Sequence, residues 1–155
     1  MQVSARVDYA LRAMTELAAT WKEDKAVALR GVEIAENQDI PKKFLENILF
    51  DLRRAGFIKA RRGAKGGYQL ARAPGQITLA DIIRAVEGPL ANVRGEWPED
   101  VVYSGAAKLL QGVWIAVRAN LRAVLESVTL DHLVRGALPG TVDKLTQNSE
   151  AWRHH

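Results

Sequence analysis

The fold of this chain is decided by one continuous stretch, DIPKKFLENILFDLRRAGFIKARRGAKGGYQLAR, which runs from Asp39 to Arg72. In its first half, apolar residues recur at intervals of three and four, which predicts an amphipathic helix. Pro41 suits the first turn of that helix, and Gly56 suits the position just after its end. We expect the helix to bury one apolar face, made of Phe44, Leu45, Ile48, Leu49 and Leu52.

The second half of the stretch predicts a β-hairpin. The runs FIKARR and YQLAR each alternate in polarity over a length typical of short strands. The link between them, GAKGG, contains enough glycine to form a tight hairpin loop.

Two helices are expected on the N-terminal side of this stretch. Ser4 is a candidate N-cap for the first, whose apolar residues recur from Val7 to Trp21. A shorter helix follows from about 30 to 38, just before the turn at Asp39–Pro41. The resulting order of helix, short helix, tight turn, helix and hairpin is that of a winged helix-turn-helix.

A second set of helices is expected on the C-terminal side. The segment ITLADIIRAVEGPL predicts a compact helix, with Thr78 as N-cap, Asp81 in the capping-box position and Gly88–Pro89 at its end. Residues 91–104 show no periodicity and are expected to form a loop. A long helix is expected from about 105 to 127, because apolar residues recur there at spacings of four and three, as in a helix packed against a partner helix. This seam consists of Leu110, Trp114, Val117, Leu121, Val124 and Val128.

The last part of the chain predicts less structure. TLDHLVRG reads as a short helix with a threonine cap, and the tail LTQNSEAWRHH is expected to be frayed. The fold class is therefore mainly α with a small β-hairpin wing. We divide the chain into a winged helix-turn-helix domain (1–90), a loop (91–104), a long helix (105–128), and a short helix with a flexible tail (129–155).

Positive charge is concentrated in the stretch that decides the fold. Residues 42–72 contain nine basic and two acidic residues, a net charge of +7, whereas the whole chain of 155 residues carries +4 and the remainder therefore −3. The excess coincides with the two elements that contact DNA in a winged helix-turn-helix. Solubility is the alternative role for exposed lysines and arginines. We expect double-stranded DNA to be the partner.

The outer side of the predicted recognition helix carries residues that could read bases. It presents Lys42, Lys43, Glu46, Asn47 and Phe50. Lys43 can reach guanine or phosphate, Asn47 can bracket adenine, and Glu46 can accept a hydrogen bond from a cytosine amino group. The alternative for Glu46 is an ion pair within the helix, with Lys42 or Lys43.

The predicted wing combines glycines with cations. Its three glycines allow positive φ angles and a close approach to a phosphate backbone. Arg61, Arg62 and Lys65 can then reach phosphates or, for an arginine at the tip, the narrow minor groove of A·T-rich DNA. Tyr68 is expected to pack beneath the wing. The loop lacks the GK[ST] ending and the following helix of a nucleotide-binding loop.

Composition disfavours several other classes of protein. The chain contains no cysteine, which removes disulfides, thiolate metal sites and cysteine-ligated clusters. Charged residues interrupt the N-terminus, unlike a signal peptide, and no apolar run approaches the ~20 residues of a membrane span, so we expect a cytoplasmic location. The histidines His132, His154 and His155 form no catalytic spacing, and His132 is expected on an exposed helix face. We expect no enzymatic activity, no metal and no cofactor.

Three motifs in the first 90 residues are specific. They are DYALRAMTELA, VEIAENQDIPKKFLENILFDLRRAGFIKARRGAKGGYQLAR and ITLADIIRAVEGPL. In these motifs the chain resembles the Rrf-two family of bacterial winged-helix transcription regulators, which includes iron–sulfur cluster regulators and cysteine-metabolism repressors. The helix expected at 105–128 is similar to the family's dimerisation helix.

The resemblance implies a homodimeric transcription regulator, in our interpretation a repressor, that binds a palindromic operator. By position, Glu46 and Asn47 match recognition-helix residues that read bases, and Arg62 matches an arginine that enters the minor groove. Ala64–Lys65 stands where many members have Pro–Gly, which we expect to add a phosphate contact. The alternative is a protein-interaction module that uses the winged helix or the seam without specific DNA binding.

The main departure from the family lies in the loop before the long helix. Many relatives carry three cysteines there, whereas this chain has NVRGEWPEDVVYSGAAK. Asp8 matches a position from which some members offer an oxygen ligand, but alone it cannot hold a cluster. The resemblance therefore implies a member without the cluster, which responds to a small molecule, to a protein or to no effector. Trp97, Tyr103 and Trp114 could line an effector pocket, and interface packing is their alternative role.

Overall fold

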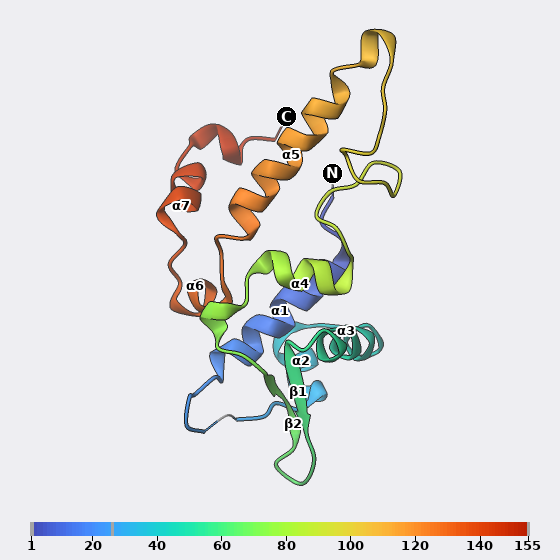
Figure 1. Cartoon of the computed structure of the whole chain (residues 1–155). Coiled ribbons are helices and arrows are strands. Elements are labelled where there is room, and N and C mark those ends of the chain that lie inside the picture. The colour runs from blue at the N-terminus through green and yellow to red at the C-terminus, as the bar shows by residue number, and fades with distance from the viewer. Residues whose placement is uncertain (1, 26, 155) are drawn as a thin grey trace.

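The computed structural model describes residues 2–25 and 27–154 of the chain. Figure 1 shows an N-terminal half of packed helices with a hairpin at one end, and a C-terminal half in which α5 runs away from them. The N-terminal half consists of α1 (Ala5–Ala19), α2 (Gly31–Gln38), α3 (Lys42–Arg54), β1 (Ile58–Arg61), β2 (Gly67–Leu70), the 3-10 turn η1 (Pro74–Gln76) and α4 (Leu79–Val86). The predicted winged helix-turn-helix, mainly α with a small β-hairpin, is confirmed.

Local caps explain where several helices begin and end. Ser4 Oγ accepts a hydrogen bond from the Val7 N–H at 3.1 Å, at the start of α1. Thr78 and Asp81 form a reciprocal capping box at α4, with donor–acceptor distances of 3.1 Å in both directions. After α3 the chain turns at Gly56, whose φ of +79° is left-handed. All three boundaries lie where the sequence predicts them.

The core of the N-terminal half is built around α1, which contacts α2, α3 and α4 and also α6 (Leu130–Arg135) from the C-terminal half. The largest fully buried side chains of this core are Met14, Leu17, Ile34, Leu45, Ile48, Leu52, Leu70, Ile77, Ile82 and Leu130. Burying a side chain of this size contributes about 1.5–3 kcal/mol. The contacts of α3 with this core therefore fix the direction in which its polar side points.

Phe44 is the member of the predicted apolar face of α3 that the core does not bury. It is 53% exposed, whereas Leu45 is 2% exposed. Phe44 lies at the edge of the apolar face, where its ring meets the Tyr9 ring edge-on at a centroid distance of 6.0 Å. The prediction that Phe44 is buried is wrong because its position on the helix directs it to the rim of the α1–α3 contact.

The C-terminal half starts with a loop over residues 88–104. It continues with the 3-10 turn η2 (Gly105–Ala107), α5 (Leu110–Leu125), α6 (Leu130–Arg135), α7 (Gly140–Thr146) and the 3-10 turn η3 (Ser149–Trp152). α5 begins at Leu110 rather than near 105, because Gly105 has a left-handed φ of +56° and a 3-10 turn precedes the helix. No helix in the described residues is both long and apolar enough to span a membrane.

After α6 the chain runs back towards α5 through α7, a helix that was not predicted (Figure 1). The following segment, expected to be frayed, carries a helical turn. Asn148 Oδ1 accepts a hydrogen bond from the Glu150 N–H at 3.1 Å, and Trp152 Nε1 donates to the Thr146 carbonyl at 2.6 Å. These short-range bonds give the turn its shape. His155, the last residue of the segment expected to be frayed, lies outside the described residues.

Candidate nucleic-acid interface

α3 presents a polar stripe opposite its buried face. Lys43, Glu46, Asn47 and Phe50 recur at helical spacing and are all exposed, and Lys42 is exposed in the first turn. Phe50, the largest of them, is 65% exposed. A helix with one free polar side of this kind fits the major groove of B-DNA.

The carboxylate of Glu46 has no ion-pair partner among the residues that the structure describes, and neither Lys42 nor Lys43 has one there. Asn47 Nδ2 approaches the Lys43 carbonyl at 3.5 Å, the outer limit of a hydrogen bond. The alternative of an ion pair within α3 therefore finds no support in the geometry. Glu46 remains available to accept a hydrogen bond from outside the chain.

The wing is joined to the rest of the domain by a third extended segment. β1 and β2 pair in antiparallel fashion. On the other edge of β2, Leu29 and Tyr68 exchange two backbone hydrogen bonds, at 2.9 and 2.7 Å. Gly67 permits this approach, because a Cβ atom there would lie 2.4 Å from the Leu29 carbonyl oxygen. Tyr68 is half-buried against the core, as expected, whereas no local pattern in the sequence indicates its link to Leu29.

The cations of the wing are exposed. Arg61, Arg62 and Lys65 surround the hairpin loop, and within residues 2–25 and 27–154 none of them makes an ion pair. Asp51, one of the two acidic residues of the cationic stretch, is paired with Arg6 on α1. Its carboxylate is therefore engaged away from the cations of α3 and the wing.

Two further cations lie beside the wing. A surface pocket of about 540 Å³ separates the wing from the segment before α2, and Lys25 and Arg30 line it together with Arg61 and Lys65. Glu33 also lines it, and hydrogen bonds from the backbone and side chain of Arg30 lower the pKa of its carboxyl. Sequence reasoning missed Lys25 and Arg30, because only the backbone pairing before α2 brings them beside the wing.

α5 differs from α3 because no residue of it is buried in the described chain. It forms one wall of an apolar groove of about 660 Å³, and Val3, Val7, Leu11 and Ile83 form the other. The α5 wall consists of Val113, Ala116, Val117, Asn120, Leu121, Val124 and Leu125. Three residues of the predicted seam, Val117, Leu121 and Val124, thus share one surface.

The other seam residues lie elsewhere. Leu110 is 39% exposed at the start of α5, and Trp114 lines a different pocket. Val128 lies beyond the end of α5 and is 3% exposed, and its carbonyl accepts a hydrogen bond from the Leu79 N–H at 2.9 Å. This position corrects the inclusion of Val128 in the seam, because Val128 packs inside its own chain.

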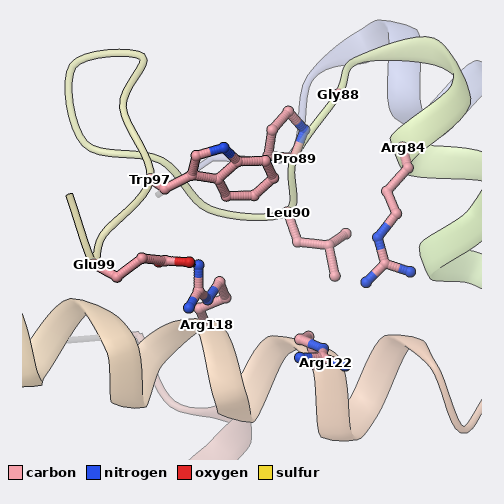
Figure 2. A pocket seen from close by; sticks show the side chains of 8 residues that line it. All are labelled: Arg84, Gly88, Pro89, Leu90, Trp97, Glu99, Arg118 and Arg122. Carbon is pink, nitrogen blue, oxygen red and sulfur yellow. The ribbon is translucent and has the colours of Figure 1, made fainter.

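The three aromatic residues predicted as an effector pocket are not gathered around one cavity. Trp114 Nε1 donates a hydrogen bond to the Tyr103 hydroxyl at 3.0 Å. Trp114 lines a pocket with Pro98 and Val117, whereas Trp97 lines another pocket that is rich in arginine (Figure 2). The loop places the two indoles in different environments because it turns at Pro98–Asp100 between them.

His132 was expected on an exposed helix face and instead contributes to a helix cap. Its Nδ1 accepts a hydrogen bond from the Thr129 N–H at 3.0 Å, and the Thr129 hydroxyl accepts one from the His132 N–H at 3.4 Å. The His132 side chain therefore forms part of the N-terminal cap of α6.

Known proteins match the chain in both sequence and structure. Residues 3–136 match the Rrf2 family, which is described as an iron-dependent transcriptional regulator. A Mycobacterium tuberculosis protein, named as a candidate HTH-type transcriptional regulator, is 40% identical over 157 residues that cover 99% of this chain and 96% of the relative.

Two solved structures are similar along most of their length. CymR, the global cysteine regulator of B. subtilis, has a TM-score of 0.74 and 33% identity, with 88% of this chain and 98% of that chain covered. IscR of T. potens has a TM-score of 0.67 and 32% identity, with 100% of this chain and 93% of that chain covered.

The iron in the family's description does not fit the donors that this chain offers. The sequence has no cysteine. Nowhere in the described residues do three His, Asp or Glu side chains gather in a way that could hold a metal ion. Asp8, the candidate oxygen donor, is paired with Arg12 at 2.9 Å.

Proposed function

The chain belongs to the Rrf2 (Rrf-two) family of DNA-binding transcription regulators, and from this premise we propose that it acts as a homodimeric repressor on a palindromic operator. Each subunit inserts α3 into the major groove of one half-site and lays its wing along the neighbouring backbone. The centres of the two half-sites lie about one helical turn, ~34 Å, apart. A dimer bound across a promoter represses by excluding RNA polymerase.

The proposal is carried by the set of exposed cations without ion-pair partners on α3 and the wing. Lysines and arginines that lack partners within the described chain are free to neutralise phosphates and release counterions. In Figure 1 the tip of the wing lies at the opposite end of the molecule from the start of α5, so a second copy held at α5 leaves the wing open to DNA.

The roles within the interface follow from side-chain chemistry. We assign base reading to Glu46 and Asn47, with Lys42 and Lys43 on guanine or phosphate. The unpaired carboxylate of Glu46 supports this assignment, because a carboxylate near phosphates is favourable only when it meets a donor such as the cytosine amino group.

The wing has a different role in the proposal. Arg61 and Lys65 contact phosphates, and Arg62 enters the minor groove. The hydrogen bonds between Leu29 and Tyr68 support this role, since they hold the hairpin against the helix-turn-helix.

The apolar groove beside α5 supports the homodimer. Val113, Val117, Leu121 and Val124 face that groove, and an exposed apolar surface of this kind is typical of a protein interface. α5 of a second copy would cover it, in line with the heptad-like spacing of the seam.

Genome-wide mapping of bound DNA, combined with deletion of the gene, tests the proposal. We expect bound sites to share a palindrome, and we expect transcripts next to those sites to rise in the deletion strain. Falling transcripts would make the protein an activator. The absence of any shared palindrome, together with recovery of a specific protein partner, would favour an interaction module.

A further inference from the structure

A cluster of arginines lies between α4, α5 and the loop that follows α4. It encloses a pocket of about 490 Å³. Figure 2 shows α5 below this pocket and the loop above it, with the indole of Trp97 on one side and the guanidinium group of Arg84 on the other. The side chains that decide its chemistry are Arg84, Leu90, Trp97, Glu99, Arg118 and Arg122.

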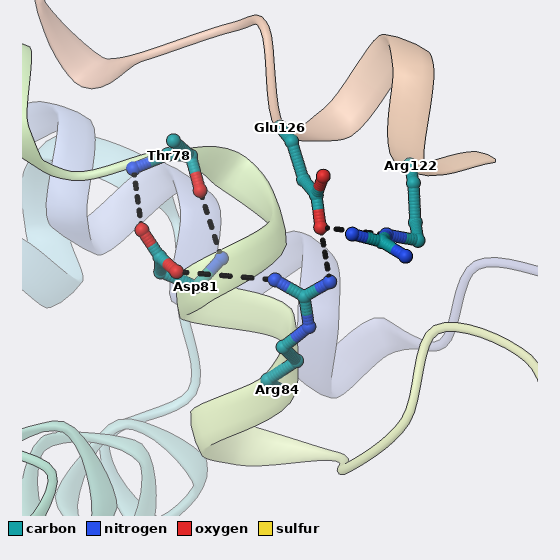
Figure 3. A network of polar contacts seen from close by, with 5 residues as sticks. All are labelled: Thr78, Asp81, Arg84, Arg122 and Glu126. Atoms are coloured by element: carbon teal, nitrogen blue, oxygen red, sulfur yellow. Dashed lines mark hydrogen bonds and ion pairs between the residues drawn. The ribbon is translucent and has the colours of Figure 1, made fainter. Parts of the chain in front are cut away.

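Each arginine of this pocket is paired with a carboxylate but carries more N–H donors than its pair uses. Glu126 Oε1 accepts hydrogen bonds from both Arg84 Nη2, at 2.5 Å, and Arg122 Nε, at 3.0 Å (Figure 3). Arg118 Nη1 donates to Glu99 Oε2 at 2.5 Å. A guanidinium group has more donors than these contacts use, so each arginine can also bind an oxyanion.

Asp81 is the remaining carboxylate near these arginines. Its Oδ1 lies 3.9 Å from Arg84 Nη1, and its Oδ2 accepts the Thr78 N–H in the capping box (Figure 3). Asp81 is therefore mainly engaged in starting α4, and its contact with Arg84 is a long one.

The walls of the pocket select the shape of such an anion. Trp97 is 50% exposed and offers an aromatic face, and Leu90 adds an apolar contact between Trp97 and the arginines. Guanidinium groups bind carboxylates and phosphates in a planar, bidentate way, and an indole favours stacking with another ring. The volume is within the range of small-molecule sites, about 300–1,000 Å³.

We propose that this pocket, lined by Arg84, Trp97, Arg118 and Arg122, binds a small aromatic carboxylate or phosphate as the effector of the regulator. The inference rests on the proposed function, because an effector acts by changing operator binding. Glu126 joins Arg84 on α4 to Arg122 on α5. An anion that takes over donors of these arginines weakens this link and changes how the winged half is held relative to α5.

Calorimetric titration of the full-length protein tests the pocket directly. The probes are 2-naphthoate and phenyl phosphate, with 2-naphthamide as the uncharged match and inorganic phosphate as the match without a ring. We expect both aromatic anions to bind. Both matched compounds should bind at least about tenfold more weakly. Arg118→Gln and Trp97→Ala should each lower the affinity for 2-naphthoate by about tenfold.

Arg135→Gln is the matched control. It removes an arginine–carboxylate pair of the same i,i+4 kind as Arg122–Glu126, at 2.9 Å from Asp131 on α6, away from the pocket. We expect it to leave probe binding unchanged. Trp97→Phe should retain most of the affinity, which separates loss of stacking from disruption of the loop.

The outcomes distinguish this inference from the proposed function, since operator binding is measured in parallel by fluorescence anisotropy. The inference is wrong, and the proposed function stands, if operator binding is intact and no aromatic anion binds at up to about 10 mM. The same holds if neither Arg118→Gln nor Trp97→Ala changes the affinity for the anions. If the anions bind but leave operator affinity unchanged, the effector role is wrong. If the probes bind and no operator is found, the proposed function fails.

Discussion

α3 and α5 are both amphipathic helices with basic residues, but they differ in which side finds partners within the chain. The apolar side of α3 is buried, whereas in α5 it is the arginines that are paired. α3 buries its apolar side and leaves its lysines and arginines without ion pairs among the described residues. α5 has no buried residue in that part of the chain, whereas its Arg118 and Arg122 are both paired with carboxylates. The side that remains unsatisfied indicates the partner: a polyanion for α3 and an apolar surface for α5.

Leu121→Asp tests the apolar side of α5 and should have the largest effect. A carboxylate in the groove opposes burial by a second copy, so we expect a monomer. Operator affinity should fall by about 100-fold or more, because linking two half-site contacts contributes about 10²–10⁴ in avidity. Sedimentation velocity and fluorescence anisotropy measure the two effects.

The matched control for that change is Leu145→Asp on α7. Leu145 is 58% exposed and lies outside the groove. Both the dimer and operator binding should survive it. A stable dimer of the Leu121→Asp variant would contradict the assignment of the groove.

Leu52→Ala tests the buried side of α3. Leu52 is 0% exposed, so its truncation should lower the free energy of unfolding by about 2–5 kcal/mol, as in other buried leucine sites. Leu109→Ala, at 82% exposure just before α5, should cost less than about 0.5 kcal/mol. Urea denaturation followed by circular dichroism compares the two, and equal losses would remove the contrast between the helices.

Replacing Arg61, Arg62 and Lys65 together by glutamine sharpens the contrast between unpaired and paired cations. We expect operator affinity to fall about tenfold or more. The slope of log affinity against log salt should become shallower by about 4–5, because the proposed dimer brings two wings to the operator. Arg118→Gln, which removes a paired arginine, should leave that slope unchanged. Anisotropy titrations at several salt concentrations test this, and an unchanged slope in the wing variant would place the phosphate contacts elsewhere.

Glu46→Ala tests base reading by α3. Discrimination should be relaxed at one base pair per half-site, by about 1–3 kcal/mol, because a carboxylate accepts from only some base edges. Competition between single-base operator variants measures this. If every variant changes equally, Glu46 has no role in reading sequence.

The smallest expected effect is a shift in the titration of Glu126, the carboxylate paired with Arg84 and Arg122. Hydrogen bonds from Arg84 and then Arg122 lower the pKa of Glu126 below its ordinary value of 4.5. Because the pKa is lowered in the folded state, the ion pairs are complete above pH 4.5 and are lost as the pH falls through the lowered pKa. Carbon-13 NMR titration should place the midpoint of Glu126 below 4.5.

Arg84→Gln should move the Glu126 midpoint upwards. It should leave the lowered pKa of Glu33 unchanged, because that shift comes from Arg30. An unaltered Glu126 midpoint would show that Arg84 does not join α4 to α5 in solution.

The parts of the fold that could be predicted from the sequence depend on neighbours along the chain. The caps at Ser4 and Thr78 act over three residues, and the turn at Gly56 depends on a single backbone conformation. The periodicity of α3 likewise separated its outer residues from its core residues, with the exception of Phe44 at the rim. The exposure of Glu46 and Asn47 follows from that same periodicity.

The features that could not be predicted depend on contacts between distant segments or on irregular backbone. The pairing of Leu29 with Tyr68 joins segments far apart in sequence, and it brings Lys25 and Arg30 beside the wing. The separation of Trp97 from Trp114 depends on the path of a loop that has no periodicity. Neither leaves a local pattern for sequence reasoning to use.

The hydrogen bonds between Leu29 and β2 have a geometric consequence for the operator. Leu29, before α2, is bonded to β2, and α3 leads directly into β1, so the hairpin is held at both ends of the helix-turn-helix. We therefore expect the distance between α3 and the wing to be constant. The length of each half-site should therefore be invariant among the DNA targets.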